Sequence, residues 1–113
     1  MEITLLLETD DRRQLRQWLI DNHATAKEVW VPMYRTHRNN DLPQMKYLEI
    51  VEEALCFGWI DSTQKGLPDG RRVQRLSPRR KHSHWTQLNI QRCQQLIERD
   101  MMTQSGIDAM PHP

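Results

Sequence analysis

Residues 47–61 constrain the fold most, because a helical pattern stops there at a glycine and an extended pattern begins at once. Apolar side chains recur with helical spacing from Tyr47 to Gly58, over about three turns. Glycine adopts at no steric cost the positive φ that ends many helices, so we expect Gly58 to end this one. The chain then continues as a strand. The helix is expected to turn its glutamates to solvent, namely Glu49, Glu52 and Glu53.

The N-terminal third predicts a strand and an amphipathic helix. Residues 3–7 form a short apolar run typical of a strand, and Thr9 or Asp10 follows in a position to cap a helix. The spacing of the next residues separates an inner face from a solvent face. The inner face holds Leu15, Trp18, Leu19 and Asn22, and the outer face holds Arg12, Arg13, Arg16 and Gln17.

Residues 28–34, EVWVPMY, are apolar on both faces, which is typical of a strand covered on both sides. Pro32 cannot donate a ladder hydrogen bond, which favours an edge strand or a bulge. Further on, residues 59–65 and 71–77 flank the turn-rich loop 66–70 and predict a β-hairpin.

Two helices are expected after the hairpin. Ser83 precedes the first helical pattern and is expected to cap it, and Thr103 is expected to cap a last short helix. The inner side of the first of these helices is expected to hold Trp85, Leu88, Asn89, Arg92, Leu96 and Ile97.

This order of elements predicts one α+β domain over residues 1–113, a size typical of a single core. We expect a two-layer sandwich of about four strands in a mixed or antiparallel sheet, with three main helices and a short C-terminal helix. The apolar run at the N-terminus is too short for a signal peptide or a membrane span. We therefore expect a cytoplasmic protein without a membrane span.

Four stretches carry a resemblance to a known family: ALCFGWID from residue 54, Lys65, QRLSPRRKHSHWTQLN from residue 74, and MTQSG from residue 102. They resemble the signature of the YdeI/OmpD-associated family, also called OmdA-like or bacteriocin-protection proteins. The resemblance runs from about Arg16 to Gly106. It implies a bacterial protein connected with bacteriocin protection or envelope stress, and no settled reaction or ligand. Members usually continue into a basic helical segment, so this chain resembles their N-terminal portion.

Positive charge gathers in residues 62–97, which hold eight Lys or Arg against one acid, Asp69. The densest part precedes the expected helix start at Ser83 and consists of Arg75, Arg79, Arg80 and Lys81. A helix N-terminus offers free N–H groups, and guanidinium groups add fork-shaped donors, so this cluster favours an anion. The alternative interpretation is a solvated run of charges.

Asp61 has two interpretations. Strand alternation places it on one face with Trp59, Thr63 and Lys65, from which it can reach Arg72 or Arg75 across the hairpin as an ion pair. A catalytic carboxylate is the alternative, although no second carboxylate lies near it in sequence to divide acid and base roles.

Asn89 and Arg92 are polar groups on an expected inner face, so they must find partners. They either pair with the backbone or an acid such as Asp61, or they line a pocket with Trp59, Trp85 and Arg75.

The two cysteines, Cys56 and Cys93, are expected to be reduced and buried, because neither belongs to a C-x-x-C pair. His82 and His84 lack nearby residues to complete a ligand set, so no metal or cofactor site is predicted.

Three functions remain open. The first is a binding domain that recognises a small anionic ligand or an acidic protein partner through Arg75, Arg79, Lys81, Ser83 and Trp85. The second is single-stranded nucleic-acid binding by the basic hairpin and its tryptophans. The third is a small-molecule enzyme, for which no nucleophile–base pair is recognisable. The full set of candidate ligand-binding residues is Trp59, Asp61, Lys65, Arg75, Arg79, Lys81, Ser83, Trp85, Asn89 and Arg92.

Overall fold

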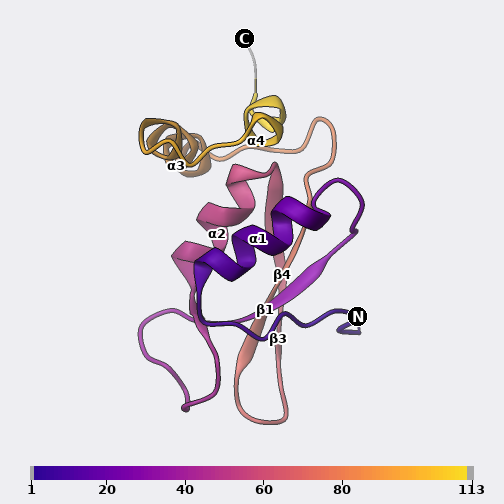
Figure 1. The fold of residues 1–113 in the computed structure, drawn as a ribbon, viewed down its shortest axis with the longest axis vertical. Helices are drawn as coiled ribbons and strands as arrows, with labels where there is room; N and C mark the ends of the chain where they lie inside the picture. The colour runs from indigo at the N-terminus through magenta and orange to yellow at the C-terminus, as the bar shows by residue number, and fades with distance from the viewer. Residues whose placement is uncertain (1, 112–113) are drawn as a thin grey trace.

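The computed structural model describes residues 2–111 and shows an α+β fold with a four-stranded mixed sheet. This confirms the predicted fold class. Its elements are α1 Arg12–Asn22, β1 Val29–Tyr34, β2 Met45–Lys46, α2 Tyr47–Cys56, β3 Trp59–Gly66, β4 Arg72–Pro78, α3 Gln87–Glu98 and α4 Gln104–Ala109. In Figure 1, α1 and α2 lie over the strands, and α3 and α4 lie beyond one end of them. Helix α2 is central, since it contacts the other three helices as well as β1, β2 and β3.

The strand order is β2-β1-β4-β3. β1 runs parallel to β2 and antiparallel to β4, and β3 and β4 form the predicted antiparallel hairpin. The hairpin register shifts between Asp61 and Gln64. On β1, Val29, Val31 and Met33 join the core beneath the helices, so period-two alternation turns the residues between them to the other face.

The predicted strand at residues 3–7 is wrong in extent, because this segment makes one isolated parallel bridge between Leu6 and Trp30. The short strand β2 occupies the rest of that edge of β1. The predicted edge position of Pro32 is also wrong, since β1 lies inside the sheet. The Trp30 amide donates to Leu5 O at 2.9 Å, away from β4. By alternation the Pro32 nitrogen also points away from β4, so the β1–β4 ladder loses no bond.

Two helices begin later than predicted. Helix α1 is capped by Asp11, which accepts from the Arg13 amide, while the Thr9 hydroxyl accepts from the Asp11 amide. Helix α3 is capped by Thr86, which accepts from the Asn89 amide at 3.1 Å, and Ser83 lies outside it. The buried residues of α3 are Cys93 and Leu96, of which Leu96 was predicted to lie on its inner side. The predicted inner residues Leu88 and Ile97 are 55% and 43% exposed. The predicted Thr103 cap of α4 is confirmed.

The prediction that Glu53 faces solvent is wrong, because its side chain is 1% exposed. Helix α1 covers it and supplies two cations that were expected on the solvent side. Arg12 Nη2 lies 2.6 Å from Glu53 Oε2, and Arg16 Nη1 lies 3.0 Å from Glu53 Oε1. Arg16 Nη2 also donates to Met101 O at 2.5 Å. Arg16 and the buried Glu53 carboxylate together therefore join α1, α2 and the connection between α3 and α4.

The core is built around α2 and the start of β3. Trp59 is 1% exposed, its ring meets Trp18 edge to face at 5.8 Å, and its indole nitrogen donates to His23 O at 3.3 Å. Cys56 and Cys93 are free and buried, as predicted. Burial raises the pKa of both thiols, that of Cys93 to about 11.

Gly58 adopts φ +74°, which confirms the expected helix end. An alanine Cβ there would lie 2.9 Å from Ser105 O and 3.0 Å from Ala109 Cβ of α4. We expect Gly58→Ala to lower the free energy of unfolding by about 2 kcal/mol, through left-handed strain and crowding against α4. Urea unfolding followed by circular dichroism measures this change, and a neutral result would contradict the role given to this glycine.

Candidate ligand-binding pocket

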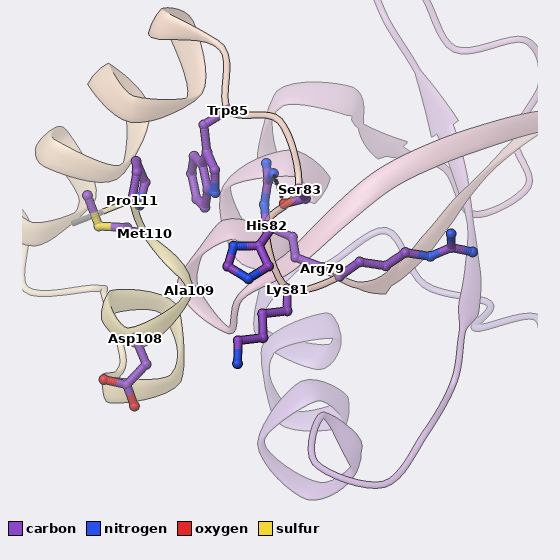
Figure 2. Close-up of a pocket in the computed structure, with 10 residues that line it drawn as sticks. Arg79, Lys81, His82, Ser83, Trp85, Asp108, Ala109, Met110 and Pro111 are labelled. Atoms are coloured by element: carbon purple, nitrogen blue, oxygen red, sulfur yellow. Dashed lines mark hydrogen bonds between the residues drawn. The ribbon is translucent and has the colours of Figure 1, made fainter. Parts of the chain in front are cut away.

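A pocket of about 610 Å³ lies between the loop that follows β4 and the C-terminal end of α4. It exists because β4 ends at Pro78 whereas α3 starts only at Gln87, which leaves a loop standing opposite α4. Residues 79–83 and Trp85 form one wall, and residues 108–111 form the other (Figure 2).

Arg79 connects this loop to the rest of the protein. Its backbone amide donates to Gly58 O at 3.0 Å, and its guanidinium carbon lies 3.7 Å from the centroid of the Trp85 ring. Nη1 donates to Ser83 Oγ at 3.4 Å and to His84 O at 3.3 Å. These contacts hold the guanidinium over the face of the indole.

The remaining donors of Arg79 are unsatisfied. Its Nε and Nη2 are buried and have no hydrogen-bond partner within residues 2–111. Burial lowers the pKa of this arginine. Buried polar groups are nearly always hydrogen-bonded, so two unpaired donors on one cation point to an acceptor that residues 2–111 do not supply.

The pocket carries an excess of positive charge. No ion pair within the described part of the chain involves Arg79, Arg80 or Lys81, and the last two side chains are exposed. Asp108 contributes one acid to the lining, and its Oδ1 accepts from Gln104 Nε2 at 2.7 Å. Three cations against one carboxylate leave a lining charge of +2 with His82 neutral.

His82 sets the path of the loop. Its φ is +63°, in the left-handed region that non-glycine residues rarely occupy, and the adjacent Ser83 amide closes a turn on Arg80 O at 3.0 Å. The turn brings the side chains at 79–83 to a common wall. The predicted helix start at Ser83 is therefore replaced by this turn, and the Ser83 hydroxyl contacts Arg79 instead of a helix amide.

The predicted ion pair of Asp61 with Arg72 or Arg75 is wrong, because no ion pair within residues 2–111 involves Asp61 and Arg75 lies on the opposite face of the sheet. Asp61 is opposite Leu76, on the helix side, and accepts from the Tyr47 hydroxyl at 2.5 Å. Arg75 is opposite Trp30, and its Nε donates to Glu28 Oε1 at 3.0 Å. Neither residue lines the pocket at residue 79.

Four other predicted site residues also lie away from this pocket. Trp59 is buried in the core. Arg92 Nη1 donates to Asn89 Oδ1 at 3.0 Å, so these two side chains pair with each other along α3. Lys65 lies on β3 opposite Val73, towards the hairpin loop. The structure therefore brings together Arg79, Lys81, Ser83 and Trp85 of the predicted set.

The wall at residues 108–111 was missed by sequence reasoning, since neither charge nor periodicity marks this segment as part of a site. Within residues 2–111, no group of three His, Cys, Asp or Glu side chains is arranged to hold a metal ion. No helix in that range has the length and apolar character that a membrane crossing requires.

Comparison with protein-family models places the chain in a family. The family model described as Domain of unknown function (DUF8412) matches residues 7–109, which is most of the chain. No curated protein and no solved structure matches the sequence.

Proposed function

Since the chain belongs to this domain family of unknown function, we propose from its pocket that the protein binds a small anionic ligand next to Trp85. The observation that carries the proposal is the Arg79–Trp85 stack, with two buried guanidinium donors that lack an acceptor within residues 2–111. A phosphate or carboxylate group supplies such an acceptor. The volume of about 610 Å³ lies within the range of small-molecule sites.

Arg80 and Lys81 supply the attraction at the mouth of the pocket. Both are exposed and have no ion-pair partner in the described part of the chain. The loop that carries them, residues 79–86, contains no acidic residue. Their charges raise the local concentration of anions and orient an incoming oxyanion towards the turn at His82. An acidic segment of a protein partner presents the same chemistry as a free ligand.

Two alternatives have less support. The hypothesis of single-stranded nucleic-acid binding requires Trp59 and Trp85 to offer exposed ring faces on which bases stack. Trp59 is buried, so its ring offers no such face. An enzyme needs a nucleophile held by a base. Ser83 and His82 both line the pocket, but the Ser83 hydroxyl accepts from Arg79, and no hydrogen bond joins it to His82 within residues 2–111.

The relationship to YdeI/OmpD-associated proteins also stays a proposal, with the cytoplasmic location and the role in bacteriocin protection that it implies. The matched family model has no stated function and bears on none of these. The proposed anion site is compatible with that relationship, because the basic loop lies inside the stretch that carries the resemblance.

We expect Lys81→Ala to weaken anion binding about tenfold, because it removes a charge-assisted contact and leaves the fold intact. Calorimetric titration with inorganic phosphate, a sugar phosphate and a nucleotide at low salt measures this change. Lys81 is exposed, so the melting temperature should stay close to that of the parent.

The matched control is Lys27→Ala, which removes the same charge from an exposed residue outside the pocket. It should bind like the parent protein. The proposal fails if none of the three anions shows saturable binding, or if Lys27→Ala weakens binding as much as Lys81→Ala.

A further inference from the structure

We propose a second ligand site, a pocket of about 410 Å³ at the other end of β4, which holds a small molecule by a carboxylate or phosphate group. Arg72 begins β4 at this pocket, whereas Arg79 directly follows the end of β4 at the first pocket. The proposal is independent of the function proposed above, because the two pockets share no residue.

The walls of this second pocket are tied together by hydrogen bonds. The loop after β1 meets the hairpin loop, where Asn39 Nδ2 donates to Gly70 O and Asn40 Nδ2 donates to Asp69 O at 3.0 Å. Buried Gln44 secures the loop from below, accepting from the Asn39 amide at 3.1 Å and donating to Asn40 O at 3.1 Å. The pocket is therefore formed before a ligand arrives, which lowers the entropy cost of binding.

Arg35 is held in place by a chain of contacts. Its guanidinium carbon lies 3.9 Å from the centroid of the Tyr47 ring, and the Tyr47 hydroxyl donates to Asp61 Oδ2 at 2.5 Å. The ring thus carries the cation on its face while a carboxylate fixes the ring at its hydroxyl end. The hydrogen bond from Tyr47 explains the position of Asp61 better than the predicted ion pair with Arg75 does, since the Asp61 carboxylate orients the Tyr47 ring.

The positive charge around this pocket has no ion-pair partner in the described part of the chain. Arg35 and Arg72 both line it, neither belongs to an ion pair within residues 2–111, and the lining includes no carboxylate. Two guanidinium forks suit a planar carboxylate or a phosphate, which accept paired hydrogen bonds. The side-chain amides of Asn39 and Gln64 then offer hydrogen bonds to a polar body on the same ligand.

The test is an NMR titration of the whole chain, with inorganic phosphate in one arm and malonate in the other. We expect saturable shifts of the Gly70 backbone amide and of the Asn39 and Gln64 side-chain amides in at least one arm. The arm that saturates at lower concentration identifies the preferred group. Absence of saturable shifts at these groups in both arms overturns the proposal.

Variants assign the shifts to this pocket. Arg72→Ala removes an exposed guanidinium and should raise the Kd reported by Gly70 about tenfold. Lys27→Ala and Lys81→Ala should leave that Kd unchanged, and Lys81→Ala separates this site from the one at Trp85. An unchanged Kd in Arg72→Ala, or an equal rise in Lys81→Ala, contradicts a separate second site.

Discussion

Trp59→Ala is expected to lower the free energy of unfolding by about 3–5 kcal/mol, the largest effect of any substitution considered for this protein. The side chain is 1% exposed and packs edge to face on Trp18. It opens β3 just after α2 ends at Cys56 and the chain turns at Gly58, so its removal leaves a cavity between the helices and the sheet. Chemical denaturation followed by far-UV circular dichroism measures the loss without depending on tryptophan emission.

Trp59→Phe separates packing from hydrogen bonding. Phenylalanine keeps much of the apolar volume but loses the indole donor to His23 O at 3.3 Å, so we expect a cost of about 1–2 kcal/mol. If alanine costs no more than phenylalanine, the space at this position collapses on truncation and the cavity argument is wrong.

Gly106→Ala is expected to lower the free energy of unfolding by about 3 kcal/mol, although alanine is the better helix former. Helix propensity alone would stabilise α4 by about 1 kcal/mol. The added Cβ, however, would lie 2.5 Å from Cys56 O at the end of α2 and would also collide with the Met102 sulfur. The methionine side chain can rotate, whereas a helix carbonyl cannot move without shifting α2.

The contact that excludes this Cβ also docks α4. The Thr103 amide donates to Cys56 O at 3.2 Å, and the Thr103 hydroxyl donates to the same oxygen, so the first turn of α4 lies directly on the end of α2. Because residues 108–111 form a wall of the pocket beside Trp85, displaced docking should weaken anion binding as well.

Gly66→Ala is the matched control for this substitution. Nothing lies within 4 Å of a Cβ built at Gly66, and its backbone does not require positive φ, so we expect a change within about 0.5 kcal/mol. Thermal and urea unfolding of Gly106→Ala, Gly66→Ala and the parent protein measure both changes. A stabilised Gly106→Ala protein would show that helix propensity outweighs the contact with α2.

Local chemistry in the sequence determined several elements correctly. The helical spacing from Tyr47, the positive φ at Gly58 and the turn-rich loop before β4 each depend on residues close together in the chain. These patterns report backbone preference and one apolar face, which is why the hairpin, α2 and the α+β class followed from them.

Helix starts were less well determined, because several residues near each start offer the same capping chemistry. Asp10 and Asp11 both carry carboxylates, and Ser83 and Thr86 both carry hydroxyls. Only the path of the chain decided between them: the loop had to turn at His82 before α3 began, and Thr86 then met the Asn89 amide.

The tertiary structure alone decided which polar residues meet. Glu53 is buried because α1 brings two arginines onto it, although its position in α2 resembles that of a solvent-facing glutamate. Asp61 accepts a hydrogen bond from Tyr47, and Arg75 forms an ion pair with Glu28. The two do not meet, because the pleat of the sheet turns neighbouring residues to opposite faces. The pocket beside Trp85 needed residues 108–111, far along the chain from the basic loop. Such contacts depend on the packing of distant elements, whereas periodicity and capping signals extend over only a few residues.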